Sequence, residues 1–160
     1  MTNKHQSLDQ LVRIYRYRQI VAKQRHNDQK EVVEKCLAEL TEIMQAVVSL
    51  QQKSVANKEY RRDGKNSSDA MKMVNALKYQ SQIEYDLERE NFYLSLAQDE
   101  LAMQEVKLNN ILAEIDKMSV KIESLAELKQ KHIRAAEISD EVTREDDYLQ
   151  TLKVNGGAHG

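Results

Sequence analysis

The fold is decided by the stretch from Leu87 to Leu108, which reads LERENFYLSLAQDELAMQEVKL. Leucine recurs every seven residues in it, at Leu87, Leu94, Leu101 and Leu108. A second core position, three residues after each leucine, makes the spacing alternate between three and four residues. Apolar residues repeated in this way are typical of an α-helix in a coiled coil.

The same alternation extends outward over sixteen positions, of which thirteen are apolar, against 41% for the whole chain. We call this series the second seam. It comprises Met73, Ala76, Gln80, Ile83, Leu87, Glu90, Leu94, Ala97, Leu101, Gln104, Leu108, Ile111, Ile115, Met118, Ile122 and Leu125. The pattern predicts a helix over about residues 69–152 and a frayed tail over 153–160.

A weaker series predicts another helix over about residues 8–61. Its expected seam comprises Leu8, Leu11, Tyr15, Arg18, Ala22, Arg25, Gln29, Val32, Cys36, Leu40, Ile43, Val47 and Leu50. Two consecutive steps of four end at Leu40, which is a stutter in the heptad repeat. Cys36 is interpreted as a small core residue, with a reactive thiol as the alternative.

The residues between the two helices, 63–69, contain the helix breakers of the chain interior. Gly64 is expected to end the first helix with a positive φ, and Ser67 or Ser68 to cap the second. Two heptad-bearing helices joined by a short turn form an antiparallel hairpin. We therefore predict one all-α domain over 1–160, a long antiparallel two-helix coiled-coil hairpin.

The register of the hairpin follows from the position of the turn. Folding about residue 65 places Leu50 near Gln80 and Leu11 near Ser119. Because the predicted second helix is longer than the first, its C-terminal 20–30 residues extend beyond the N-terminal end of the first helix.

Composition excludes several classes of protein. The chain has no proline, whereas roughly eight would be expected at average usage of about 5%. A net charge of −2 gives no bulk attraction to nucleic acid. No apolar run reaches 18 residues, so we expect no membrane insertion. A single cysteine allows no intramolecular disulfide and indicates a reducing compartment.

Catalysis finds no support in the sequence. The four histidines are scattered, and no histidine or cysteine follows another at the spacing of a metal site. Neither a glycine-rich phosphate loop nor a zinc motif occurs. We therefore expect a protein that is not an enzyme, with no catalytic residue, metal or cofactor.

Positive charge is concentrated near the N-terminus, where residues 1–30 carry seven lysines and arginines and two acids. We call Arg13, Arg16, Arg18, Lys23 and Arg25 the basic segment. No acid lies between Gln10 and Asn27. The segment fits a solvated face or a docking patch for an acidic protein. Nucleic acid is the third alternative, disfavoured because the chain as a whole is not basic.

Two further groups leave alternatives open. One group is aromatic and comprises Tyr79, Tyr85, Phe92 and Tyr93. These side chains either pack beside the seam of their own hairpin or contact a partner protein. The acidic stretch is either a solvated face or a second binding element. Its members are Glu137, Asp140, Glu141, Glu145, Asp146 and Asp147.

Two patterns carry a resemblance to a known family. Leu11, Arg13, Ile14, Arg18 and Ala22 form the run L-x-R-I-x-x-x-R-x-x-x-A. It resembles the start of the YscO/FliJ-type stalk proteins of type III secretion and flagellar export. The sequence REDD at 144–147 is similar to the acidic ends of YscO members.

The resemblance implies a cytoplasmic bacterial protein that acts as the stalk of a hexameric secretion ATPase. Its role would be similar to that of the γ subunit of rotary ATPases, with links to the export gate and to chaperones. The basic segment would then contact an acidic surface of the ATPase, and the isolated chain would be a monomer. The alternative is a dimeric coiled-coil scaffold or tether, in which the leucines of the second seam pair between chains.

Overall fold

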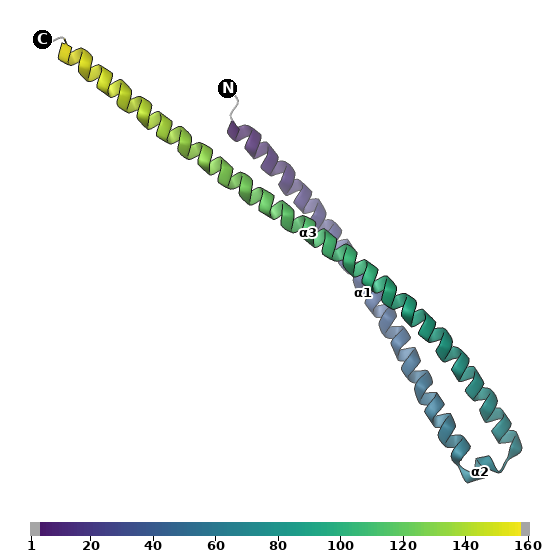
Figure 1. Ribbon diagram of the computed structural model, residues 1–160. Coiled ribbons are helices and arrows are strands. Elements are labelled where there is room, and N and C mark those ends of the chain that lie inside the picture. Colours follow the sequence, from purple (N-terminus) through teal and green to yellow (C-terminus); the bar gives the residue numbers. More distant parts are fainter. Residues whose placement is uncertain (1–3, 158–160) are drawn as a thin grey trace. The chain divides into compact units, whose positions relative to one another are not determined.

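The computed structural model describes residues 4–157, with side chains over 6–155, and this part of the chain consists of three helices. The two long ones are α1 (Lys4–Arg62) and α3 (Ala70–Gly157), and the short α2 (Gly64–Ser67) lies between them (Figure 1). The long helices pack against each other as an antiparallel coiled-coil hairpin, which confirms the predicted fold class. α3 ends at Gly157, five residues beyond its predicted end at residue 152. Residues 158–160 of the predicted frayed tail lie outside the described part.

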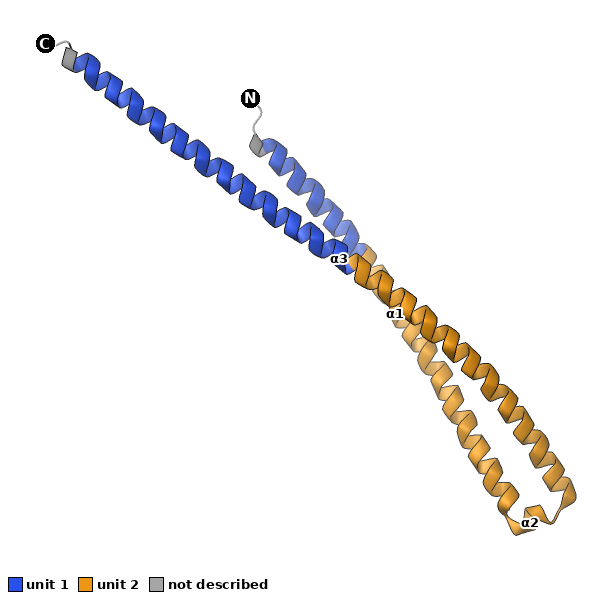
Figure 2. Ribbon diagram, viewed as in Figure 1, with its two compact units in different colours: residues 1–24, 112–160 blue, residues 25–111 orange. Residues whose placement is uncertain are grey.

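Contacts between the helices divide the chain into two units (Figure 2). Unit 2 is residues 25–111, and unit 1 combines residues 1–24 with 112–160. Each boundary falls within a continuous helix. No described helix is both long enough and apolar enough to cross a bilayer.

The turn in unit 2 is held by two aspartates rather than by glycine geometry. Asp63 Oδ1 accepts a hydrogen bond from the Lys65 N–H (3.0 Å) and caps α2. Asp69 Oδ1 accepts from the N–H groups of Met71 (3.0 Å) and Lys72 (3.2 Å), so Asp69 caps α3.

Two expectations for this turn were therefore wrong. Gly64 has no positive φ, because it begins the helical turn α2 instead of ending α1. The Ser67 and Ser68 hydroxyls donate back to the carbonyl oxygens of Gly64 and Lys65, so neither serine caps α3.

The second seam is confirmed in full, since all sixteen of its residues are buried or half-buried. Ile83 is its most buried large side chain, at 2% exposure. The four leucines at 87, 94, 101 and 108 are half-buried within unit 2. Their apolar surface is thus covered inside one chain.

The first seam differs from the expected one between Leu8 and Cys36. Val12, Gln19, His26 and Val33 occupy it, and the residues just before each of them, Leu11, Arg18, Arg25 and Val32, are exposed. The steps then alternate between four and three from Leu8 to Arg61, so the predicted stutter is absent. This frame partially buries Gln19 and His26 instead of two guanidinium groups, which would be costly to desolvate.

Polar side chains on the seams fix the register in each unit. In unit 2, Asn57 Nδ2 donates to the Ala76 carbonyl oxygen and to Gln80 Oε1, both at 3.0 Å. Gln29 Nε2 donates to Gln104 Oε1 at 2.8 Å. A polar pair of this kind between two helices makes the coiled coil less stable than an apolar pair would. It disfavours other registers of the two helices, because its hydrogen bonds would then be lost.

In unit 1, Gln19 Nε2 donates to Ser119 Oγ at 2.6 Å, and Lys129 Nζ donates to Asp9 Oδ1 at 2.7 Å. Ser119 thus faces Gln19 and not Leu11, and Gln80 faces Ser54 and Asn57 and not Leu50. The predicted register was wrong by three to eight residues, since the contacting pairs are centred on about residues 67–69 and not on residue 65.

Candidate partner-binding surfaces

All five side chains of the basic segment are exposed. Four of them, at positions 13, 16, 18 and 23, belong to unit 1. There the seam is formed by Tyr15, Gln19 and Ala22, which leaves the four bases outside it. None of these four bases is needed to hold the two helices together, so their charge is available to a partner.

The bases of unit 1 lie on two sides of α1. Arg16 and Lys23 are seven residues apart and share one flank of the seam, with Arg13 beside them. Arg18 lies on the opposite flank. Arg25, which belongs to unit 2, repeats the heptad position of Arg18. The structure therefore does not gather the basic segment into one patch, as a single docking patch would require.

Arg18 is oriented by an aromatic ring of its own helix. Its guanidinium carbon lies 5.7 Å from the centroid of the half-buried Tyr15 ring. A cation–π contact of this kind at an exposed site contributes about 0.5–1 kcal/mol. It holds the charge of Arg18 close to the seam rather than far out in solvent.

Large apolar side chains are exposed among these bases. Ile20 is 65% exposed and lies on the side of Arg16 and Lys23, and Tyr17 is 68% exposed. The flank of Arg16 and Lys23 thus combines positive charge with apolar surface, which suits an acidic protein partner better than a bare phosphate backbone.

A second surface is the part of α3 that no described side chain of α1 covers. We call residues 134–155, all of them exposed, the overhang. It carries six acids and three bases. The acids are the six residues of the acidic stretch predicted to be solvated or partner-binding, and their exposure leaves both alternatives open.

The overhang has an apolar series of its own, at steps of three and four. Its members are Ala135, Ile138, Val142, Glu145, Leu149 and Leu152. The second seam does not predict this series. Each of its positions lies one residue before the position that the heptad spacing of the second seam would give. The signal was nevertheless present, since five of the six positions are apolar. An exposed amphipathic helix of this length is a candidate for docking in a groove of another protein.

An open groove of about 410 Å³ lies near the turn in unit 2. Tyr60 and Tyr79 line it together with Lys53, Lys72 and the buried Asn57. It is a depression between the two helices and not an enclosed pocket. Among residues 4–157, no group of His, Cys, Asp or Glu side chains is placed to hold a metal ion.

Cys36 is half-buried, at the seam position that the heptad repeat predicts. Tyr79, Tyr85, Phe92 and Tyr93 are all exposed. The Phe92 and Tyr93 rings have centroids 6.0 Å apart and an interplanar angle of 58°. None of the four lies on the second seam.

In comparisons with known proteins, no family model, curated protein or solved structure matches the chain.

Proposed function

We propose that this chain is a non-enzymatic stalk protein of a bacterial type III secretion or flagellar-export system. In the cytoplasm it would bind a hexameric export ATPase, regulate its turnover, and link it to the export gate or to chaperones. The proposal rests on the resemblance of Leu11–Ala22 and of the REDD sequence at 144–147 to YscO/FliJ-type proteins, and on a fold that suits the role.

The observation that carries the proposal is the position of the basic segment outside the seam. All five of its side chains are exposed, and they lie on both flanks of α1. A stalk inside a ring of subunits is approached from several sides, so bases on both flanks can meet more than one acidic surface. Exposed ion pairs are individually weak, which allows contacts to change as the subunits change conformation.

The dimeric scaffold is the less favoured alternative. It needs the leucines of the second seam to pair between chains. These leucines are half-buried within unit 2 of a single chain. Pairing them between chains would require α1 to leave α3 first, which exposes the apolar residues of both seams.

The test measures phosphate release by the secretion ATPase of the same system. We expect the wild-type chain to bind the hexamer and to stimulate turnover. The charge-reversed variant Arg13→Glu/Arg16→Glu/Arg18→Glu should lose most of the stimulation. Its matched control reverses three exposed lysines of unit 1 in α3, Lys117→Glu/Lys121→Glu/Lys131→Glu, and should retain it.

Two results would count against the proposal. A wild-type chain that neither sediments with the hexamer nor changes its turnover would overturn the stalk function itself. Equal stimulation by the triple arginine variant and the wild type would overturn only the role of the basic segment.

A further inference from the structure

The outer face of α3 in unit 2 carries a second apolar series, opposite the seam. Tyr85, Phe92, Leu96, Met103 and Val106 are 49–62% exposed. With Arg89 and Asp99 at the intervening positions, they follow steps of four and three from 85 to 106. This spacing places them along one side of the helix. We call these five apolar residues the outer stripe.

The outer stripe is not required by the hairpin. Over this stretch the second seam is the buried or half-buried side of α3, and a purely solvated face needs no apolar repeat. Scattered apolar residues on a surface are ordinary, whereas a run with heptad spacing over 22 residues is what a further helix would pack against.

The charge around the outer stripe is strongly negative. Residues 85–106 carry six carboxylates and one base, a net charge of −5. The carboxylates belong to Asp86, Glu88, Glu90, Asp99, Glu100 and Glu105. The base, Arg89, is held close to two of them.

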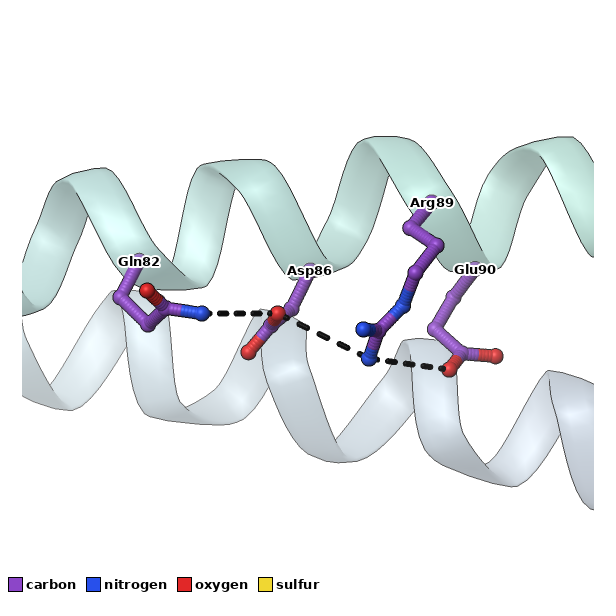
Figure 3. A network of polar contacts seen from close by, with 4 residues as sticks. All are labelled: Gln82, Asp86, Arg89 and Glu90. Atoms are coloured by element: carbon purple, nitrogen blue, oxygen red, sulfur yellow. Dashed lines mark hydrogen bonds and ion pairs between the residues drawn. The ribbon is translucent and has the colours of Figure 1, made fainter.

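Figure 3 shows how Arg89 is held. Its Nη2 lies 3.7 Å from Asp86 Oδ1 and 3.9 Å from Glu90 Oε1. Gln82 Nε2 donates to the same Asp86 oxygen at 3.0 Å. The positive charge of this stretch is therefore already paired within α3. A partner meets a stripe that is mostly apolar, with Asp99 inside it, and that has further carboxylates at its edges.

We propose that the outer stripe binds an amphipathic helix of another protein, with an apolar face flanked by lysine and arginine. Charge complementarity selects this occupant. Five of the six carboxylates lie off the second seam, so a second copy docked through the same stripe would bring two acidic faces together, which is unfavourable. The stretch is about 33 Å long at 1.5 Å per residue, so it accommodates roughly 20 residues of partner helix.

This inference goes beyond the proposed function and does not depend on the ATPase. Its probe is a synthetic 21-residue peptide made of three IAKLKAK heptads, which supplies isoleucine and leucine at the core positions and lysine beside them. The control peptide has glutamate in place of every lysine. Binding is measured by fluorescence anisotropy of a labelled peptide at 150 mM salt.

We expect the basic peptide to bind the full chain and the acidic peptide not to bind. The variant Phe92→Ser/Met103→Ser should weaken binding roughly tenfold or more, because central apolar contacts dominate such interfaces. The matched control Val48→Ser/Val55→Ser removes exposed apolar residues of α1 in the same unit and should leave the affinity unchanged. All these side chains are exposed, so circular dichroism should show the same helicity in each variant.

Three outcomes would overturn the proposal. One is a wild-type chain that does not bind the basic peptide. Another is that the Phe92→Ser/Met103→Ser variant binds the basic peptide as tightly as the wild-type chain does, which would mean that charge alone accounts for the binding. The third is a homodimer of the unliganded chain that Phe92→Ser/Met103→Ser dissociates, which would make a second copy the occupant.

Discussion

At the scale of single residues, the basic segment is available to a partner only if its arginines lie outside the seam of α1. Both Arg18 and Gln19 can occupy a seam position at heptad spacing, and the same is true of Arg25 and His26. The structure places Gln19 and His26 on the seam and leaves Arg18 and Arg25 exposed. A guanidinium without a partner is costly to bury, which favours the frame that the structure adopts.

Gly64 provides a test of the turn at the same scale. It has helical geometry in α2, and a Cβ added there would meet nothing within 4 Å. Alanine fits this conformation and restricts the unfolded chain. We expect Gly64→Ala to raise the free energy of unfolding by about 0.4–1 kcal/mol, measured by urea denaturation. A loss of stability would mean that residue 64 needs the positive φ of a terminating glycine.

At the scale of elements, the second seam could be read directly from the sequence, whereas the register could not. Thirteen apolar residues at sixteen positions leave one frame for α3. Register is harder because a heptad repeat pairs nearly as well after a slip of seven residues. The decisive information lies in polar pairs such as Asn57 with Gln80, whose partners are identifiable only once the turn is known.

Removing the polar layers of unit 2 should therefore loosen the register. We expect Asn57→Leu/Gln29→Leu to give a second population of label distances, displaced by about 10 Å, which is one heptad at 1.5 Å per residue. The measurement is double electron–electron resonance between spin labels at residues 38 and 78, with Cys36→Ser in the parent and the variant. These two positions are about 30 Å apart along the helix axis, so an axial slip changes the label distance by nearly its full length. A single narrow distance in both proteins would mean that the apolar seam alone sets the register.

The overhang gives a second prediction for an element. Its residues are exposed on every side, and isolated helices in water are marginal without packing. We expect backbone amides over 134–155 to exchange with deuterium much faster than those over 80–125 in the free chain. Binding of the ATPase or another partner to the overhang should slow this exchange. Equal protection of both segments in the free chain would show that the overhang is packed in solution.

At the scale of the whole molecule, the fold class follows from the sequence, and the functional surfaces follow only in part. The basic segment was visible as a run of charges, but its division between two flanks depends on a seam frame that the sequence left ambiguous. The outer stripe of α3 was noted only as a group of aromatic residues. Its leucine, methionine and valine members are indistinguishable from core residues until the seam is fixed.

The central claim is that one chain closes its own seam and offers its charged flanks to other proteins. Light scattering coupled to size-exclusion chromatography tests it most directly, because it gives the mass independently of shape. We predict a single species near 18.6 kDa over the accessible range of concentration. A stable species of twice that mass would contradict the claim, and would favour the dimeric scaffold over the stalk.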